Sequence, residues 1–201
     1  MPDFASLDPE TRCYALVGQL LCKFTELETC LNAAIQAAMR VHDLMRFILC
    51  ANLTLQQKVA VLRATLSVSD LPTTEYDYFK STLDMISDKI IPKRNMIAHD
   101  FFQPDATGNG VQFLHVKAKS NFQLPSTIWS STDFQDLGRE IVRISTAVAK
   151  LRDALQGVNF DYNRVTRLVT VISPLNIPAD AVLKIPGDTE PPRSGLISSS
   201  S

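Results

Sequence analysis

The fold is decided by residues 8–40, which read DPETRCYALVGQLLCKFTELETCLNAAIQAAMR. Apolar residues recur along this stretch at alternating spacings of three and four: Tyr14, Val17, Leu21, Phe24, Leu31, Ile35 and Ala38. These spacings place the side chains on one face of a long helix. Asp8 can cap the first turn of that helix, and Pro9 suits its first position.

Glu28 interrupts this apolar face. A carboxylate that faces the interior of a bundle needs a cationic or hydrogen-bonding partner, whereas a carboxylate at the edge of the face stays in water. The edge position is the simpler interpretation. If Glu28 is buried instead, Arg94 is the nearest obvious cation that could pair with it, and Glu28 would then be a structural partner of the segment around Arg94.

Two shorter helices are expected next. Thr54 can cap a helix while Gln57 reaches back to it, which is a capping-box pattern. The buried face of that helix would contain Leu55, Val59, Leu62 and Leu66. Before it, residues 42–51 are apolar enough for another turn or two of helix.

A further long helix is predicted from about Thr74 to Ile90. Pro92 then removes a backbone donor and pushes Ile91 away from helical angles. Two alternatives follow: the helix kinks at this point, or a new helix opens at Pro92. Either one sets the direction of residues 94–99.

The pattern changes after Asp100. Residues 101–103 and 111–116 flank a loop that is dense in turn-forming residues, which predicts a β-hairpin over about 101–117. A last long helix is predicted from about Thr132 to Leu155, with a second capping-box pattern between Thr132 and Gln135. Its apolar face contains Leu137, Ile141, Ile144, Val148 and Leu151. The expected fold is therefore mainly α, a bundle of four to five helices with a β-hairpin inserted before the last one.

Residues 1–156 are expected to form one helical domain, and residues 157–201 a C-terminal extension. Within the extension, residues 163–172 could form a strand or a helical turn. From Pro174 onward, five prolines and a terminal run of serines predict an extended or disordered tail.

Composition limits the functions that need to be considered. Twenty Lys and Arg against 21 Asp and Glu give a net charge of −1, which argues against non-specific coating of nucleic acid but leaves room for a small basic site. No secretory signal is visible, and no apolar run is long enough for a membrane span. The cytoplasm is the expected compartment.

The four cysteines are Cys13, Cys22, Cys30 and Cys50. They contain no Cys-x-x-Cys pair and no histidine cluster stands near them, so neither zinc nor another cofactor is expected. They fall among apolar positions of the predicted helices, where a reduced cysteine behaves as a small hydrophobe.

One segment combines side chains that are typical of a catalytic or anion-binding site: Arg94-Asn95-Met96-Ile97-Ala98-His99. On a helix, Asn95 and His99 share a face, and Arg94 lies about 7.5 Å from His99 by rise, a distance that an arginine side chain can cover. Histidine can transfer a proton near neutral pH, and arginine offers a charged fork that fits phosphate oxygens. Asn95 could orient the imidazole or contact a ligand, while Lys89 and Lys93 add positive charge for substrate binding.

This segment resembles the signature of the HEPN superfamily, in which an arginine is followed after four to six residues by a histidine. The polar residue after Arg94 and the small residue before His99 also match. The surroundings fit, because long predicted helices precede the motif and another follows it. The resemblance covers roughly residues 10–156.

The resemblance implies a helical bundle that forms a homodimer and brings two Arg/His motifs together in one cleft. It implies a metal-independent endoribonuclease in which His99 acts as base or acid at the 2′-hydroxyl of RNA and Arg94 holds the scissile phosphate. The product would carry a 2′,3′-cyclic phosphate. Such proteins are often toxins or defence effectors, some of them neutralised by an antitoxin or nucleotidyltransferase partner.

Two function classes follow from these observations. The first is the endoribonuclease, and the second is a catalytically inactive helical dimer that serves as a nucleotide-binding or protein-interaction module. An arginine and a histidine near a helix end also do structural work, by pairing with carboxylates or capping carbonyls. Arg94 and His99 that face a shared solvent cleft of the dimer would favour the first class, and burial within one subunit the second. His42 and His115 are expected to be ordinary surface or packing residues.

Overall fold

The computed structural model describes residues 4–118, 122–158 and 160. They belong to the unit formed by residues 1–161, which is described here by itself. This unit is mainly helical and has a small antiparallel sheet before its last long helix, which confirms the predicted fold class. The segments predicted over residues 163–172 and from Pro174 onward lie outside the described residues.

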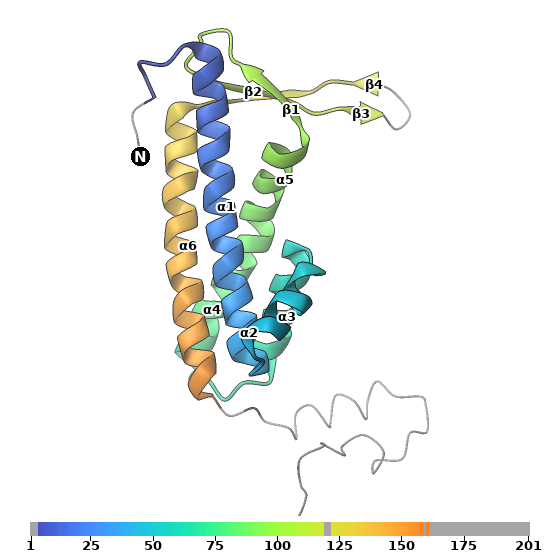
Figure 1. Ribbon diagram of the computed structural model, residues 1–201, viewed down its shortest axis with the longest axis vertical. Helices are drawn as coiled ribbons and strands as arrows, with labels where there is room; N and C mark the ends of the chain where they lie inside the picture. Colours follow the sequence, from blue (N-terminus) through green and yellow to red (C-terminus); the bar gives the residue numbers. More distant parts are fainter. Residues whose placement is uncertain (1–3, 119–121, 159, 161–201) are drawn as a thin grey trace, which may run out of the picture. The chain divides into compact units, whose positions relative to one another are not determined.

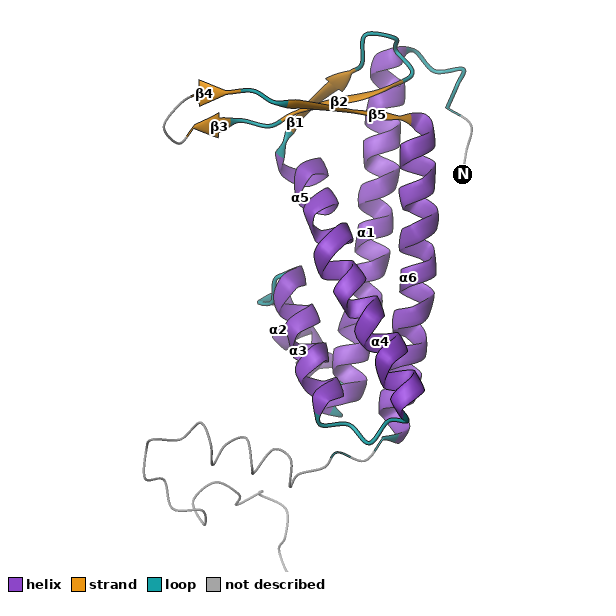
Figure 2. Cartoon of the chain, turned by 180° about the vertical axis from the view of Figure 1, so that it is seen from behind, coloured by secondary structure: helices purple, strands orange, loops and turns teal. Residues whose placement is uncertain are grey.

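Two long helices form the frame of the unit. Helix α1 (Pro9–Met39) and helix α6 (Ser131–Gly157) lie side by side and run in the same direction (Figures 1 and 2). The Asp8 carboxylate caps α1, as predicted, by accepting the backbone N–H groups of Glu10 and Thr11. A capping box of Ser130 and Asp133 begins α6, so the cap predicted at Thr132 is wrong by two residues.

The buried surface of α1 is wider than the predicted stripe. Tyr14 is 59% exposed and Leu21 is 37% exposed, so their assignment to the core is wrong. Helix α1 packs against α6 and also against the helices that carry residues 55–67 and 91–99, and it therefore buries side chains over a broad arc. Its buried residues include Leu16, Val17, Leu20, Phe24, Leu27, Leu31 and Ile35. On α6, all five of the predicted apolar residues are buried.

Helices α2 (Asp43–Ala51) and α3 (Leu55–Ser67) follow α1. Thr54 and Gln57 form the predicted capping box at the start of α3. Of the residues predicted for its buried face, Leu55 is partly buried, and the other three are fully buried.

Helix α4 (Thr73–Met85), the π-helical turn η1 (Ile86–Ile90) and helix α5 (Ile91–His99) form one continuous rod (Figure 2). The rod passes through Pro92 without leaving helical geometry: Ile91 has φ −59° and ψ −45°, so its predicted departure from helical angles is wrong. The physical reason is the wider π turn, in which the Ile91 N–H donates to the Ile86 carbonyl five residues back. Pro92 then lies in the first turn of α5, where its missing donor costs little.

The predicted hairpin is confirmed as strands β1 (Phe101–Pro104) and β2 (Gly110–Leu114), which pair in antiparallel fashion. A third strand, β5 (Ser126–Ser130), was not predicted, and it pairs with the other side of β2. Strands β3 (Lys117–Ala118) and β4 (Phe122–Gln123) form a separate pair between β2 and β5 in the chain.

Aromatic side chains fix the sheet to the helices. The ring of Phe113, on β2, lies 6.2 Å from Phe102, 5.6 Å from Trp129 and 6.3 Å from Phe134, measured between centroids. Phe113 and Phe134 are both buried. Because Phe134 belongs to α6, the sheet is held at the end where α6 begins and α5 stops, which fixes the course of the chain after His99.

All four cysteines are free thiols, and they do not share one environment. Cys13 and Cys50 are buried and Cys30 is partly buried, and burial raises the pKa of these three thiols. They fit the prediction of small hydrophobes. Cys22 is exposed, so the prediction is wrong for this residue.

Candidate functional site

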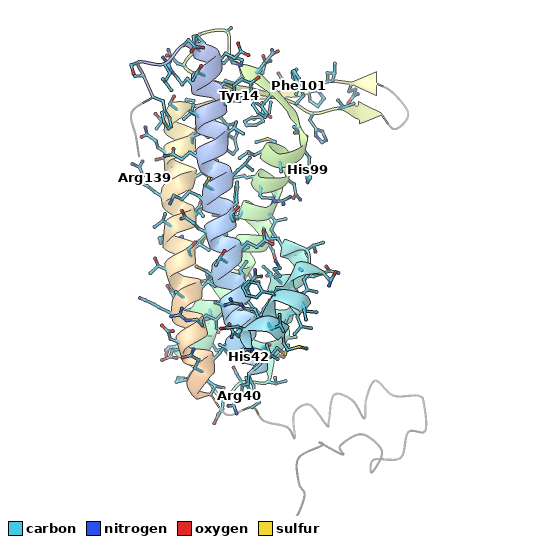
Figure 3. The ribbon with its side chains drawn as sticks, in the orientation of Figure 1. Tyr14, Arg40, His42, His99, Phe101 and Arg139 are labelled. Carbon is cyan, nitrogen blue, oxygen red and sulfur yellow. The ribbon has the colours of Figure 1, made fainter. Side chains whose placement is uncertain are left out.

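The Arg94–His99 segment forms the last turns of α5, and the chain enters β1 directly after it (Figure 3). Nη1 of Arg94 lies 3.3 Å from Nε2 of His99 and 3.4 Å from Oδ1 of Asn95. The structure therefore brings the three candidate catalytic side chains into one group, which we call the Arg/Asn/His triad. The long arginine side chain spans the rise between the two turns, as the helical spacing requires.

The triad is open to solvent while the helix beneath it is anchored. Asn95 and His99 are exposed and Arg94 is partly buried, whereas Ile90 and Ile97 on the other side of the rod are buried in the core. Within the described residues, Arg94 forms no ion pair with a carboxylate. The triad is thus available to an external anion.

The contact between Arg94 and His99 depends on the tautomer of the imidazole. A guanidinium group can only donate hydrogen bonds, so the contact is a hydrogen bond in the tautomer that leaves Nε2 of His99 without a proton. That tautomer is also the one whose Nε2 can accept a proton from a substrate hydroxyl.

The two candidate substrate-binding lysines lie apart from the triad. Nζ of Lys93 lies 6.0 Å from the centroid of Trp129, so this ammonium is directed toward the end of β5. Its charge also helps to lower the pKa of Asp133, after the larger effect of the hydrogen bonds from Ser130. Lys89 is exposed on η1. In the described part of the chain, neither lysine hydrogen-bonds to the triad.

Glu28 does not pair with Arg94, and that prediction is wrong. Its Oε1 atom lies 2.5 Å from Nζ of Lys58 on α3. Lys58 is only 2% exposed, and a buried ammonium requires a counter-charge, so the carboxylate on the facing helix is engaged there. Glu28 is therefore a partner of the α1–α3 contact and not of the triad.

A second histidine, His115, contacts Asp100, the residue that directly follows the triad in the chain, and the sequence interpretation did not connect the two. His115 is a surface residue, as predicted, with a side chain that is 52% exposed, and its Nδ1 atom lies 2.8 Å from Oδ1 of Asp100, whose side chain is 11% exposed. The hairpin register could have revealed the pair: Phe101 lies opposite Leu114, which places Asp100 opposite His115 one step further out. Asp100 directly follows His99, so the two histidines flank the start of the sheet.

His42 is not part of this group. Its Nδ1 atom accepts the Leu44 N–H at 3.5 Å as the N-cap of α2, and it lies at the opposite end of α1 from His99 (Figure 3). The described residues contain no cluster of three or more His, Cys, Asp or Glu side chains that could hold a metal ion. None of the helices described is long and apolar enough to cross a membrane.

Comparison of the chain with protein-family models, with curated proteins and with solved structures gives no match. The resemblance to the HEPN superfamily therefore depends on the motif and on its helical frame. The geometry of the triad is the observation on which a function can be argued.

Proposed function

We propose that the chain is a metal-independent endoribonuclease of HEPN type that acts as a homodimer with a composite Arg/His site. The observation that carries this proposal is the 3.3 Å contact between Nη1 of Arg94 and Nε2 of His99 on an accessible helix end. It places a permanent cation beside a proton acceptor, which are the two functions that cleavage of a phosphodiester by its own 2′-hydroxyl requires.

In the proposed reaction, Nε2 of His99 removes the proton of the 2′-hydroxyl, and the 2′-oxygen forms a bond to the adjacent phosphorus. The bond between phosphorus and the 5′-oxygen breaks, and this oxygen takes up a proton. The products are a 2′,3′-cyclic phosphate and a 5′-hydroxyl. Arg94 binds the non-bridging oxygens and stabilises the charge that develops on them.

The dimer supplies the second proton-transfer group. One His99 cannot act as base and acid at the same moment, and a two-fold pair of copies offers one His99 for each task. Asn95 orients the imidazole, and Lys89 and Lys93 attract the RNA backbone. The biological role that we propose is that of a toxin or defence effector, controlled by an antitoxin or nucleotidyltransferase partner.

The test is incubation of the purified protein with total RNA in EDTA, followed by analysis of the cleaved ends. We expect cleavage with 2′,3′-cyclic phosphate ends, and a loss of about 10²–10⁴-fold in His99→Ala, as is typical of general acid–base groups. Arg94→Ala should lose cleavage as well. Because these side chains contribute little packing, both variants should keep the melting temperature of the wild type.

One variant serves as a matched control. Arg139→Ala removes an exposed arginine of α6 that pairs with Asp136, away from both the triad and α2. It should cleave like the wild type. A wild type that cleaves no RNA, together with a His99→Ala variant that is destabilised by about 1–3 kcal/mol, would rule out the nuclease and assign His99 a structural role.

A catalytically inactive dimer is the second candidate. The net charge of −1 favours it, because a protein without excess positive charge attracts RNA weakly. In that case the triad would hold the phosphate of a nucleotide without cleaving it, and the chain would serve as a nucleotide-binding or protein-interaction module. Saturable binding of a nucleotide that is lost in Arg94→Ala, without cleavage by the wild type, would identify this class.

A further inference from the structure

Helix α2 exposes its apolar side chains instead of burying them. Of its nine residues only Cys50 is buried. Five large apolar side chains are exposed, and together we call them the α2 face: Leu44 at 65%, Met45 at 46%, Phe47 at 62%, Ile48 at 52% and Leu49 at 41%. A surface helix normally turns such residues toward the core.

The polar side of α2 is the side that contacts the rest of the unit. Oδ1 of Asp43 accepts a hydrogen bond from Nε2 of Gln36 at 2.7 Å, and Nη1 of Arg46 donates to Oε1 of the same glutamine at 2.9 Å. Gln36 belongs to α1. These two bonds and buried Cys50 fix the rotation of α2, so the outward direction of the α2 face is set by specific contacts.

The α2 face is large for a helix of this length. If a large side chain counts roughly 200 Å², the five residues expose about 500 Å² of surface. The largest apolar patch on a typical monomer is about 300–600 Å² and is often functional. An exposed apolar surface of this size on one short helix is typical of a binding surface.

We propose that the partner is a second copy of this chain, and that two α2 helices pack face to face across a two-fold axis. A symmetric contact requires a patch that is complementary to itself. The α2 face meets this requirement, because its five residues are all apolar. Asp43 and Arg46 are the two charged residues of α2, and both are hydrogen-bonded to Gln36. The guanidinium of Arg46 also lies 4.7 Å from the centroid of the Phe47 ring, so the one cation of α2 lies at the edge of the α2 face.

The exposed area of the α2 face also fits a second copy of this chain as the partner. Two copies would bury at most about 1,000 Å² in total from the α2 faces, which is about the lower bound for a specific interface, so neighbouring surface would have to contribute to the contact. Leu, Ile, Phe and Met suit the apolar centre of a homodimer interface. A membrane surface fits less well, because interfacial helices need lysines and arginines along their polar side, and the one arginine of α2 is engaged by α1.

This inference depends on the geometry of α2 and shares with the proposed function only the requirement for a dimer. Its test therefore uses no RNA. Sedimentation of the full chain over a concentration series should show a monomer–dimer equilibrium. Phe47→Glu and Ile48→Glu each place a charge in the α2 face, and we expect each to raise the dissociation constant about tenfold or more.

Val142→Glu is the matched control, since Val142 is 47% exposed on α6 and the substitution is chemically the same. It should leave the dimer unchanged. His99→Ala should also leave it unchanged, which separates loss of assembly from loss of cleavage. A monomeric wild type would overturn the inference, and so would a dimer that neither glutamate variant weakens.

Disulfide crosslinking provides a second route if the charged variants do not fold. Ile48 lies at the centre of the arc formed by the α2 face, at about 100° per residue, and would therefore lie close to the two-fold axis. Ile48→Cys in a Cys22→Ser background should form a covalent dimer on mild oxidation, while Val142→Cys in the same background should not. A monomer that does not crosslink but sediments with phosphatidylcholine–phosphatidylserine vesicles through Phe47 would assign the α2 face to a membrane surface and overturn the proposal.

Discussion

Lys58 shows how a single buried charge organises its surroundings. It is the only charged residue among the described ones that is buried, and its partner Glu28 keeps 38% of its side chain exposed. The pair is therefore asymmetric: the ammonium depends on the carboxylate, whereas the carboxylate could be solvated without the ammonium. Breaking such a pair from one side costs more than replacing both partners, because it leaves a buried charge without compensation.

Glu28→Gln should accordingly lower the free energy of unfolding by about 1–3 kcal/mol, the cost of leaving a buried polar group without its partner. In the double variant Glu28→Gln with Lys58→Met, part of this loss should be recovered, because no buried charge remains. Urea unfolding of the wild type, both single variants and the double variant measures the coupling. Strictly additive effects would show that the pair contributes nothing beyond its separate residues.

The Asp100–His115 and Glu28–Lys58 contacts differ in how far they could be predicted from the sequence. The Asp100–His115 pair was within reach, because a hairpin of known turn position also fixes which residues lie opposite one another. Lys58 and Glu28 are 30 residues apart on separate helices. The sequence pattern does not show how one helix is rotated about its axis relative to the other, so it does not predict this contact. The sequence suggested Arg94 as the partner of Glu28, but the packing of α1 against α3 brings Lys58 to it.

At the scale of elements, the contact between β2 and β5 depends on a missing side chain. A Cβ atom at Gly110 would lie 2.3 Å from the carbonyl oxygen of Trp129. The obstacle is backbone of the neighbouring strand, so a rotamer change cannot relieve it. Gly110 lies opposite Ser130, the residue that caps α6, and the close approach therefore links the sheet to the start of that helix.

Gly110→Ala should destabilise the protein by about 1–3 kcal/mol, as overpacked sites do. Gly18→Ala is the matched control: Gly18 lies within α1, nothing stands within 4 Å of its added Cβ, and the helix should gain about 0.5–1 kcal/mol. Thermal unfolding measures both changes: the melting temperature should fall in Gly110→Ala and rise in Gly18→Ala. Equal melting temperatures for Gly110→Ala and the wild type would mean that β5 can separate from β2 without cost.

The elements themselves were largely predictable, and their exact starts were not. Thr54 begins α3 as predicted because a single capping pattern precedes that helix. Before α6, the pattern of Thr132 and Gln135 predicted the start, but Ser130 and Asp133 form the cap, because β5 ends at Ser130 and the helix begins directly after it. Strand β5 itself was missed because four of its five residues are exposed and its sequence lacks a clear alternation.

At the scale of the whole unit, three carboxylates gather at one end. Asp8 caps α1, Asp133 belongs to the cap of α6, and Asp105 lies in the turn between β1 and β2 (Figures 1 and 2). Hydrogen bonds from neighbouring threonine or serine hydroxyls, followed by backbone N–H groups, lower the pKa of all three below the ordinary value of 3.8. Each of them therefore stabilises the fold more when it is ionised than when it is protonated.

The lowered pKa values of these carboxylates determine how the stability of the fold changes with pH. A group with a lowered pKa contributes its full stabilisation above the ordinary value of 3.8, and this contribution is lost as the pH falls through the lower value in the folded state. We expect acid to loosen the sheet end first. Trp129 is the only tryptophan of the chain and lies at this end, so its fluorescence should change at a higher pH than the helical circular dichroism.

Asp133→Asn provides the control, because the amide keeps the size of the side chain and does not titrate. This variant should reduce the difference in pH between the fluorescence transition of Trp129 and the transition in helical circular dichroism. Fluorescence and circular dichroism that change together throughout the acid range would show that the unit unfolds as a whole and that these carboxylates do not act locally.

The π turn has a consequence for how the triad is encoded. Each residue of an α-helix turns the chain by about 100°, and the wider turn of η1 accommodates one extra residue without passing that rotation on to the residues beyond Pro92. Deleting one residue within η1 would therefore restore an ordinary α-helical turn and leave His99 and Ile97 facing as they do now, whereas inserting one more residue would turn the segment from Arg94 to His99 by about 100° if the turn did not absorb it. The direction of His99 is thus set upstream of the motif, by the number of residues before Pro92 and by the type of turn that holds them.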